Sequence, residues 1–524
     1  MRKSKLGLVS ALALTLAGGA AFAQDSTITL KSFDGFTQLR GELLGFEDGF
    51  YTIQTRLGTL RVDGGQVTCE GDGCPSNLLF GAEFAIRGSN TVGEDLMPLL
   101  IEGYADSLDA TLEREISTDG TGRTFRIIHE NGEEMAAIDL VALGSSAAFP
   151  ALTDGEAQIG MSSRRITEQE VASLGNAGLD DPRDTDRESI VALDGLVIVV
   201  SSDNPIRSIS ISEAARIFAG DITNWSELGG LDEPINVYSR NTGSGTYDTF
   251  VDLVMTPNGL SVTSAALPID NNTDISDRVA TDAGAIGFTG FAYTRGAKVV
   301  PIRQECGMLS EPSAFSIKTE EYPLTRRLYL YDTEADAPVH AENLVEFAST
   351  DAAVPYIEDA GFVSLATDGQ GLGEQGLRIS YAMTGEEEFS LPLMREMLRE
   401  FQNAERLSTT FRFTPGSSQL TVKSQRDAED FAEDIVDGKF DGKEIILVGF
   451  TDSIGQFELN RALAERRAQG VLFTIAEAVS EIVTDANFEG ADISVQGYGE
   501  LTPVGCNTTF QGRVANRRVE VWVR

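Results

Sequence analysis

The stretch SRNTGSGTYDTF, residues 239–250, joins a glycine- and hydroxyl-rich turn to a helical pattern. Apolar residues from Tyr247 to Val254 recur at the i, i+3, i+4 and i+7 positions of an amphipathic helix. The helix should therefore begin at residues 244–246. Because the first N–H groups of a helix are unpaired and carry partial positive charge, this loop can hold an oxyanion.

A simpler interpretation of the same loop is that Ser244 only caps the helix. In the alternative, Ser244, Gly245 and Thr246 donate hydrogen bonds to an anion. Arg240, four residues before Ser244, would then supply a full positive charge. The loop by itself does not separate the two interpretations.

Three further loops place hydroxyl groups between an apolar strand and a helix. They are RGSNTVGEDLMPLL at 87–100, ALGSSAAFPAL at 142–152 and IGMSSRRI at 159–166. Since α/β sheets bind ligands at the C-terminal ends of their strands, we expect these loops to converge with the 239–250 loop. The candidate residues in the three loops are Ser89, Thr91, Val92, Ser145, Ser146, Ser163 and Arg164.

The hydrophobic pattern divides the chain into four regions after its N-terminal segment. Residues 24–80 carry short alternating runs separated by Asp-Gly turns, which predict the hairpins of a small β-barrel. Residues 82–366 alternate strand and helix patterns, which indicates an α/β domain with a largely parallel sheet. Residues 367–404 begin with a glycine-rich stretch and are interpreted as a connector. Residues 405–524 form a compact α/β unit that ends in a half-buried strand, VEVWVR.

Residues 1–23 have the features of a secretory signal peptide. Arg2, Lys3 and Lys5 precede an apolar run that closes on Ala-Phe-Ala, so the mature chain should be exported. The full chain has 41 basic and 81 acidic residues and a net charge of −40, which excludes nucleic acid as a partner. Such a charge also repels anions at long range, so an anion site must work through local geometry.

Cysteine and histidine usage limits the chemistry of the chain. Cys69 and Cys74 flank Glu-Gly-Asp-Gly, and in an oxidising compartment we expect a local disulfide between them. The pairing of Cys306 and Cys506 stays open. Because the chain has only two histidines, it offers very few candidate residues for a histidine metal site or a Ser-His-Asp triad. We therefore expect no metal, no cofactor and no enzymatic activity.

A family resemblance follows from the order of eight segments. GSNTV, GSSAAF, IGMSSR, DGLVIVVSSDNP, IFAGDITNWSELGG, YSRNTGSGTYDTF, GAIGF and YPLTRRLYLY resemble the periplasmic phosphate-binding proteins of ABC transporters, the PstS-like proteins, over residues 82–366. The resemblance implies a type II-like periplasmic-binding-protein fold, with two α/β lobes that close on a dehydrated oxyanion. It also implies an ABC transporter permease as a partner, although the sequence leaves open whether a transporter receives the cargo.

The resemblance assigns roles to individual loop residues. The matching ligand residues are Arg240, Ser244, Gly245 and Thr246, with Thr91 and the backbone of Val92 from the first loop and Ser145 or Ser146 from the second. The best-known members of the family have an aspartate in the third loop, where this chain has Ser163 beside Arg164. Specificity for phosphate over sulfate is therefore expected to be weak.

The C-terminal region contains a candidate site for an amino-acid end. Asp452 follows a buried strand, and Asn460 and Arg467 share one helix face because they are seven residues apart. A carboxylate and a guanidinium suit a free ammonium and carboxylate, although a surface salt bridge without a ligand is the alternative.

A second resemblance bears on this site. GFTDSIGQFELNRALAERRAQGV, GYGELTPVGCN and GRVANRRVEVWV resemble the OmpA-like peptidoglycan-binding domain over residues 405–524. The resemblance implies that Asp452 and Arg467 bind the diaminopimelate of the wall peptide, with Asn460 and Arg517 in support. Phe450 stands where the family usually has a histidine.

Together these observations predict a periplasmic binding protein for phosphate or a related oxyanion, anchored non-covalently to peptidoglycan. The inner face of the outer membrane is a candidate location. One alternative is a wall-associated structural or interaction protein whose binding lobes no longer bind an anion. A further alternative is an enzyme acting on phosphorylated compounds, but no nucleophile and base pair can be assembled from the residues found.

Overall fold

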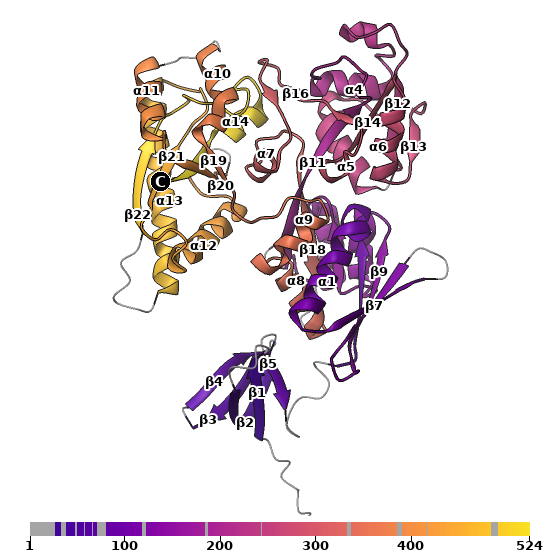
Figure 1. Ribbon diagram of the computed structural model, residues 1–524, viewed down its shortest axis with the longest axis vertical. Helices are drawn as coiled ribbons and strands as arrows, with labels where there is room; N and C mark the ends of the chain where they lie inside the picture. Colours follow the sequence, from indigo (N-terminus) through magenta and orange to yellow (C-terminus); the bar gives the residue numbers. More distant parts are fainter. Residues whose placement is uncertain are drawn as a thin grey trace, which may run out of the picture. The chain divides into compact units, whose positions relative to one another are not determined.

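The computed structural model divides the chain into two compact units, Met1–Phe80 and Gly81–Arg524, which are described separately (Figure 1). The predicted signal peptide lies outside the described residues. No helix among the described ranges is long and apolar enough to cross a membrane. The described residues are 27–32, 38–47, 50–56, 58–64, 67–70, 80–117, 122–183, 187–242, 244–332, 337–384, 390–414, 417–483 and 491–524.

The first unit is an open antiparallel sheet. Its strands are β1 (Thr27–Ser32), β2 (Gln38–Glu47), β3 (Phe50–Thr55), β4 (Gly58–Asp63) and β5 (Val67–Glu70), in the order β4-β3-β2-β1-β5. The predicted hairpins are confirmed, but the predicted barrel is wrong. Within the described ranges β4 and β5 form the two edges and do not pair, so the sheet does not close. Cys69 on β5 is disulfide-bonded, whereas Cys74 lies outside the described residues.

The binding domain consists of two lobes that share one continuous sheet. The strand order is β13-β12-β14-β11-β18-β10-β6-β9-β8-β7, with β15 also paired to β11. Each lobe has a parallel core, β10-β6-β9 in lobe 1 and β13-β12-β14 in lobe 2, while the remaining pairs are antiparallel. The sheet is therefore mixed rather than largely parallel.

Lobe 1 contains strands β6 to β10 and the helices packed on them. Its strands are β6 (Ala82–Gly88), β7 (Thr111–Ile116), β8 (Gly122–Ile128), β9 (Glu134–Ala142) and β10 (Ile159–Ser162). Its helices are η2 (Val92–Leu96), α1 (Met97–Ser107), α2 (Ala148–Thr153), α3 (Glu168–Asn176), α8 (Val339–Phe347) and α9 (Val354–Asp359).

Lobe 2 contains β12 to β17 and four α-helices. Its strands are β12 (Asn236–Arg240), β13 (Leu267–Ile269), β14 (Ala285–Gly290), β15 (Lys298–Val299), β16 (Ile302–Arg303) and β17 (Leu309–Ser310). Its α-helices are α4 (Ile211–Ala219), α5 (Gly245–Phe250), α6 (Asn272–Thr281) and α7 (Ala314–Lys318). Phe218, Phe250 and Phe288 pack together in the core of this lobe, with Phe250 stacked on Phe288 at 3.9 Å between ring centroids.

Two long antiparallel strands, β11 (Glu188–Val200) and β18 (Thr325–Asp332), join the lobes. The first part of β11 pairs with β18 beside β10 of lobe 1, whereas its last part pairs with β14 of lobe 2. The pairing register shifts between Ile190 and Ala192. These two strands therefore connect the lobes, and a hinge motion of one lobe against the other would have to bend them.

The C-terminal domain is a five-stranded sheet covered on both faces. Its strands are β19 (Gly369–Gly371), β20 (Glu405–Arg412), β21 (Glu444–Gly449), β22 (Asp492–Gly497) and β23 (Arg518–Val523), in the order β19-β20-β23-β21-β22. Its helices include α10 (Gly376–Thr384), α11 (Leu391–Glu400), α12 (Val422–Val436), α13 (Phe457–Ile482) and α14 (Phe510–Asn516). The segment expected to be a connector contributes β19, α10 and α11 to this domain.

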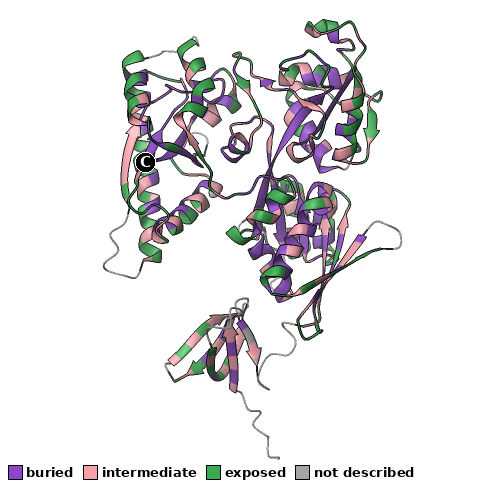
Figure 2. Cartoon of the chain, viewed as in Figure 1, coloured by how far each residue is buried: buried purple, intermediate pink, exposed green. Residues whose placement is uncertain are grey.

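The last strand, β23, is fully buried rather than half-buried as predicted (Figure 2). Val519, Val521 and Val523 pack in the core on the α12 and α13 face. Trp522 packs on the opposite face against Phe401, with 4.5 Å between the ring centroids. Helix α11 covers that second face. The alternation of apolar and polar residues along β23 therefore does not leave one side of the strand exposed.

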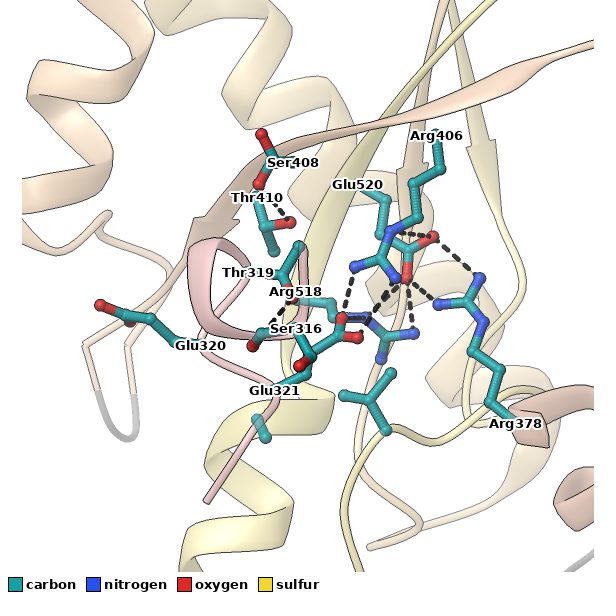
Figure 3. Close-up of polar contacts among 12 residues, drawn as sticks. Ser316, Thr319, Glu320, Glu321, Arg378, Arg406, Ser408, Thr410, Arg518 and Glu520 are labelled. Atoms are coloured by element: carbon teal, nitrogen blue, oxygen red, sulfur yellow. Dashed lines mark hydrogen bonds and ion pairs between the residues drawn. The ribbon is translucent and has the colours of Figure 1, made fainter. Parts of the chain in front are cut away.

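Glu520, a buried carboxylate on that face of β23, lies in a cluster of ion pairs (Figure 3). Arg378 donates to it at 2.5 Å and Arg518 at 2.7 Å, while Arg406 bridges to Glu321 of the binding domain. Burial opposes ionisation of Glu520, but the three arginines hold its pKa well below its usual range. A buried carboxylate is tolerated here because it is paired and hydrogen-bonded.

Candidate functional site

The predicted helix start in the 239–250 loop is confirmed. Helix α5 begins at Gly245, and Ser244 caps it by accepting a hydrogen bond from the Thr246 N–H at 3.2 Å. Gly243 lies outside the described residues. Ser244 thus has the capping role of the simpler interpretation, and the remaining question is what else the loop contacts.

The four predicted loops converge at the junction of the lobes. The Thr91 hydroxyl of lobe 1 lies 3.1 Å from the Thr246 hydroxyl of lobe 2. The Ser145 and Ser163 hydroxyls of lobe 1 are 3.1 Å apart. Gly245 of lobe 2 packs so closely on them that a Cβ atom there would lie 1.9 Å from the Ser163 oxygen. All five residues are buried, so a ligand among them would be stripped of water.

Three further residues of the predicted set differ in where they lie. Ser89 is fully buried and its hydroxyl accepts from the Val92 N–H at 3.4 Å. Ser146 is exposed, which leaves Ser145 as the hydroxyl of the second loop. Arg164 is directed to Glu170, with which it forms two hydrogen bonds of 2.9 and 2.7 Å. Arg164 is therefore bound to Glu170, the third residue of helix α3, rather than directed into the lobe junction.

Arg240 is a buried cation at the edge of this junction. Its side chain donates to Asn272 Oδ1 at 2.5 Å and to the Asp270 carbonyl at 2.7 Å. Within the described part of the chain its Nε atom has no hydrogen-bond partner. Burial lowers the pKa of Arg240 to about 10, with half-buried Glu94 acting in the opposite direction. Because a buried charge without a close counter-ion is costly, this guanidinium suits a bound anion.

A second buried arginine beside the loop was not identified from the sequence. Arg326 on β18 forms an ion pair with Asp194 on β11 at 2.6 Å, and the two residues face each other in the strand register. The Arg326 guanidinium also lies 3.3 Å from the Thr246 hydroxyl. Asp194 further accepts from the Phe291 N–H at 3.0 Å. Charged residues inside otherwise apolar strand patterns, Asp194 in ALDGLVIVV and the Arg326-Arg327 pair in TRRLYLY, were the available signal.

The C-terminal site has the predicted loop and helix geometry. Asp452 accepts a 2.7 Å hydrogen bond from Arg517, and Asn460 donates to the Asp452 carbonyl at 3.3 Å. Arg467 lies over the ring of Phe413 at 5.1 Å. Within the described ranges its Nε and Nη1 atoms have no hydrogen-bond partner.

Arg467 and Arg517 therefore both lie near the carboxylate of Asp452. Burial lowers the pKa of Arg467, and the neighbouring Arg517 lowers it further, while Asp452 opposes this. Two guanidinium groups beside one carboxylate leave positive charge for the carboxylate of a ligand. Asn507 was not identified from the sequence. Its side chain accepts a hydrogen bond from the Ser453 N–H at 3.3 Å.

Phe450 does not belong to this site. It is buried in the core on the α11 face, and the Arg518 guanidinium lies 4.2 Å from its ring centroid. The residue that replaces the usual histidine therefore packs against the ion-pair cluster, and the Asp452 loop is built without it.

This fold and these sites define a two-lobed binding protein with an additional C-terminal domain. Residues 116–351 match the PBP superfamily domain, and residues 412–517 match the OmpA family. The chain therefore contains a PBP superfamily domain that is similar to PstS and SphX proteins, and it carries a C-terminal OmpA domain.

The related proteins cover about half of the chain. Protein SphX of Synechococcus elongatus is 29% identical over 289 residues, which are 51% of this chain and 81% of that protein. The phosphate-binding protein PstS of Bacillus subtilis is 29% identical over 239 residues, which are 45% of this chain and 74% of that protein. An ABC-type phosphate transport receptor from Vibrio cholerae is a similar solved structure, with 24% identity and a TM-score of 0.41, covering 53% of this chain and 99% of that chain.

Proposed function

We propose that this chain is a periplasmic binding protein for phosphate or a related oxyanion. The observation that carries the proposal is the buried approach of the two lobes, with the Thr91 hydroxyl against that of Thr246 and the Ser163 hydroxyl against Gly245. The buried guanidinium of Arg240, on the strand that precedes this loop, supplies a positive charge. Hydroxyl donors and a buried cation are the groups that a dehydrated oxyanion needs. The relatives named phosphate-binding proteins support the same ligand class. A permease that receives the anion is part of the proposal.

We further propose that the C-terminal domain, over residues 405–524, anchors the protein non-covalently to peptidoglycan. Asp452 is suited to the ammonium of diaminopimelate, and Arg467 to its carboxylate. The protein would then act in the periplasm, held at the wall near the inner face of the outer membrane. The binding lobes, over residues 82–366, would bind the anion without chemical conversion.

Calorimetry tests the anion proposal on the full mature chain. Titration with inorganic phosphate should show one site per chain, and Arg240→Ala should remove most of the affinity. Mass spectrometry of anions released from the purified protein identifies the natural ligand. If neither method detects an anion, the lobes are not an anion site.

A second candidate function has a specific observation in its favour. The Thr91 and Thr246 hydroxyls, and those of Ser145 and Ser163, already hydrogen-bond to each other. These contacts suit a wall-associated protein whose lobes bind no anion and instead contact a partner. The titration separates the two functions, because such a protein gives no heat with phosphate or sulfate. Turnover of a phosphate ester would instead indicate an enzyme.

A further inference from the structure

The C-terminal domain is attached to lobe 2 by a disulfide and a buried ion pair. Cys306, in the β16–β17 hairpin, is bonded to Cys506, with 5.7 Å between the Cα atoms. The ion pair is Arg406 with Glu321, and the Arg406 side chain is fully buried. Next to the disulfide, the Cys506 N–H donates to Gln304 at 2.9 Å. Lobe 2 and the C-terminal domain therefore cannot separate while the disulfide is intact.

The same domain also contacts lobe 1. Arg426 on helix α12 donates to the carbonyl of Glu188 at 3.0 Å. Glu188 is the first residue of β11, and its side chain forms an ion pair with Arg165 of lobe 1 at 2.8 Å. Farther from the hinge, Lys439 forms an ion pair with Asp351 of lobe 1 at 3.3 Å. The domain thus bridges the lobes.

A third set of contacts lies close to the strands that join the lobes. Arg412 of β20 donates to the Thr319 carbonyl at 2.6 Å, at the end of α7 and six residues before β18 begins. Glu320, the next residue, accepts from Arg327 of β18 at 2.6 Å. The C-terminal domain therefore contacts β11 directly through Arg426, and it reaches β18 through the turn at Thr319 and Glu320.

Opening would break some of these contacts. The lobes are in contact in this structure, with Thr91 at 3.1 Å from Thr246 and Tyr293 of lobe 2 donating to Asp95 of lobe 1 at 2.9 Å. A rotation at the hinge changes the distance from Glu188 to Cys306. Because the disulfide holds the C-terminal domain on lobe 2, the contacts to lobe 1 are the ones that must be lost.

We propose that the C-terminal domain braces the closed lobes, and that Arg426 and Lys439 slow the release of the bound anion. Contacts that exist only in the closed state shift the equilibrium towards it, and the binding affinity rises with the closed population. The proposal rests on anion binding by the lobes, as proposed above. The proposal extends that function, because wall attachment and retention of the anion would both depend on the C-terminal domain.

Release of radiolabelled inorganic phosphate from the full, oxidised mature chain tests the brace. The protein is loaded, chased with unlabelled phosphate and sampled by rapid filtration. We expect Arg426→Ala to release phosphate at least about fivefold faster, at the low end of coupling between linked sites. Lys439→Ala should act in the same direction, and Arg426→Lys should restore part of the retention. Arg399→Ala, an exposed position on α11, is the matched control and should leave release unchanged.

A second measurement separates bracing from a general loss of stability. Hydrogen exchange of residues 188–195 and 325–328 should accelerate in Arg426→Ala while the melting temperature changes by only a few degrees. Mild reduction of the Cys306–Cys506 bond in the folded protein should also accelerate release, because lobe 2 is then free to move.

The outcomes distinguish the two proposals. Wild-type protein that binds no phosphate overturns the proposed function and the brace with it. Wild-type protein that binds phosphate, with Arg426→Ala, Lys439→Ala and the reduced protein all releasing it at the wild-type rate, overturns the brace alone.

Discussion

Replacing Gly245 with alanine tests whether the lobe junction is the anion site. Gly245 is the first residue of α5, and its backbone is in a conformation that alanine adopts, so the fold should survive. The new Cβ atom would lie 1.9 Å from the Ser163 hydroxyl and 2.8 Å from that of Ser145, both in the opposite lobe. Ordinary contacts begin at 3.4 Å, so the lobes cannot close as they do in the wild type.

The expected size of the effect follows from this crowding. Rotation of the Ser163 hydroxyl relieves only part of it, because the Ser163 Cβ atom would remain 3.2 Å away. Overpacking of a well-packed site costs about 1 to 3 kcal/mol. Since closure is required to bring both lobes onto the anion, phosphate affinity should fall by about five- to 150-fold.

Calorimetry with phosphate measures this loss, and two variants control it. Gly470→Ala, in helix α13 with no atom within 4 Å of the added Cβ, should leave affinity unchanged. Ser163→Gly combined with Gly245→Ala removes the two clashing atoms of Ser163 but not the Ser145 hydroxyl, so it should recover part of the affinity lost in Gly245→Ala alone. Wild-type affinity in Gly245→Ala would refute the reasoning, because the anion would then bind without the observed approach of the lobes.

Three further predictions concern the wall site, the hinge and selectivity. Asp452→Ala and Arg467→Ala should each abolish co-sedimentation with peptidoglycan, since each leaves one charged group of the wall peptide unpaired in the complex at a cost of about 2 to 5 kcal/mol; sedimentation of both variants would contradict the anchor. Burial opposes ionisation of Glu320, but Arg327 and other cations lower its pKa to about 2 from an ordinary 4.5. A lowered acid pKa stabilises the fold above pH 4.5, by up to about 3 kcal/mol, and this is lost as the pH falls towards 2. Thermal melts at these pH values should therefore show a smaller acid loss in Glu320→Gln. Wild-type protein should prefer phosphate over sulfate by less than about tenfold, or 1.4 kcal/mol, and Ser163→Asp should raise this preference in competition titrations; a strong wild-type preference would mean that another group, such as half-buried Glu94, accepts the phosphate proton.

Local patterns were sufficient to predict the loops of the candidate anion site. The helix start at Gly245 follows from the apolar spacing after it, because a helix must bury one face. Convergence of Thr91, Ser145 and Ser163 follows from the rule that strand ends of an α/β sheet meet at one edge. Exposure of Ser146 could not be predicted, because adjacent hydroxyls on a turn are equivalent until the turn is built.

Contacts between distant segments were beyond such patterns. The fully buried β23 strand depends on Arg378 and Arg406, which lie 142 and 114 residues before Glu520 and neutralise its charge. An alternating strand with a charged residue is normally exposed on that side, since an unpaired buried carboxylate is costly. The barrel prediction failed for a related reason, because alternation specifies hairpins but not whether the edge strands pair.

The same limit explains why the docking of the C-terminal domain was not foreseen. Cys306 and Cys506 are 200 residues apart, and four cysteines allow several pairings. Arg426 lies on a predominantly acidic helix, where the sequence alone predicts that a basic residue contacts solvent, and its contact with Glu188 depends on the fold. A flexible tether would leave the lobes free to open. Here the disulfide holds the C-terminal domain on lobe 2 and Arg426 holds it on lobe 1, and these two lobes must move relative to each other. Wall attachment through this domain would therefore act on anion release as well as on location.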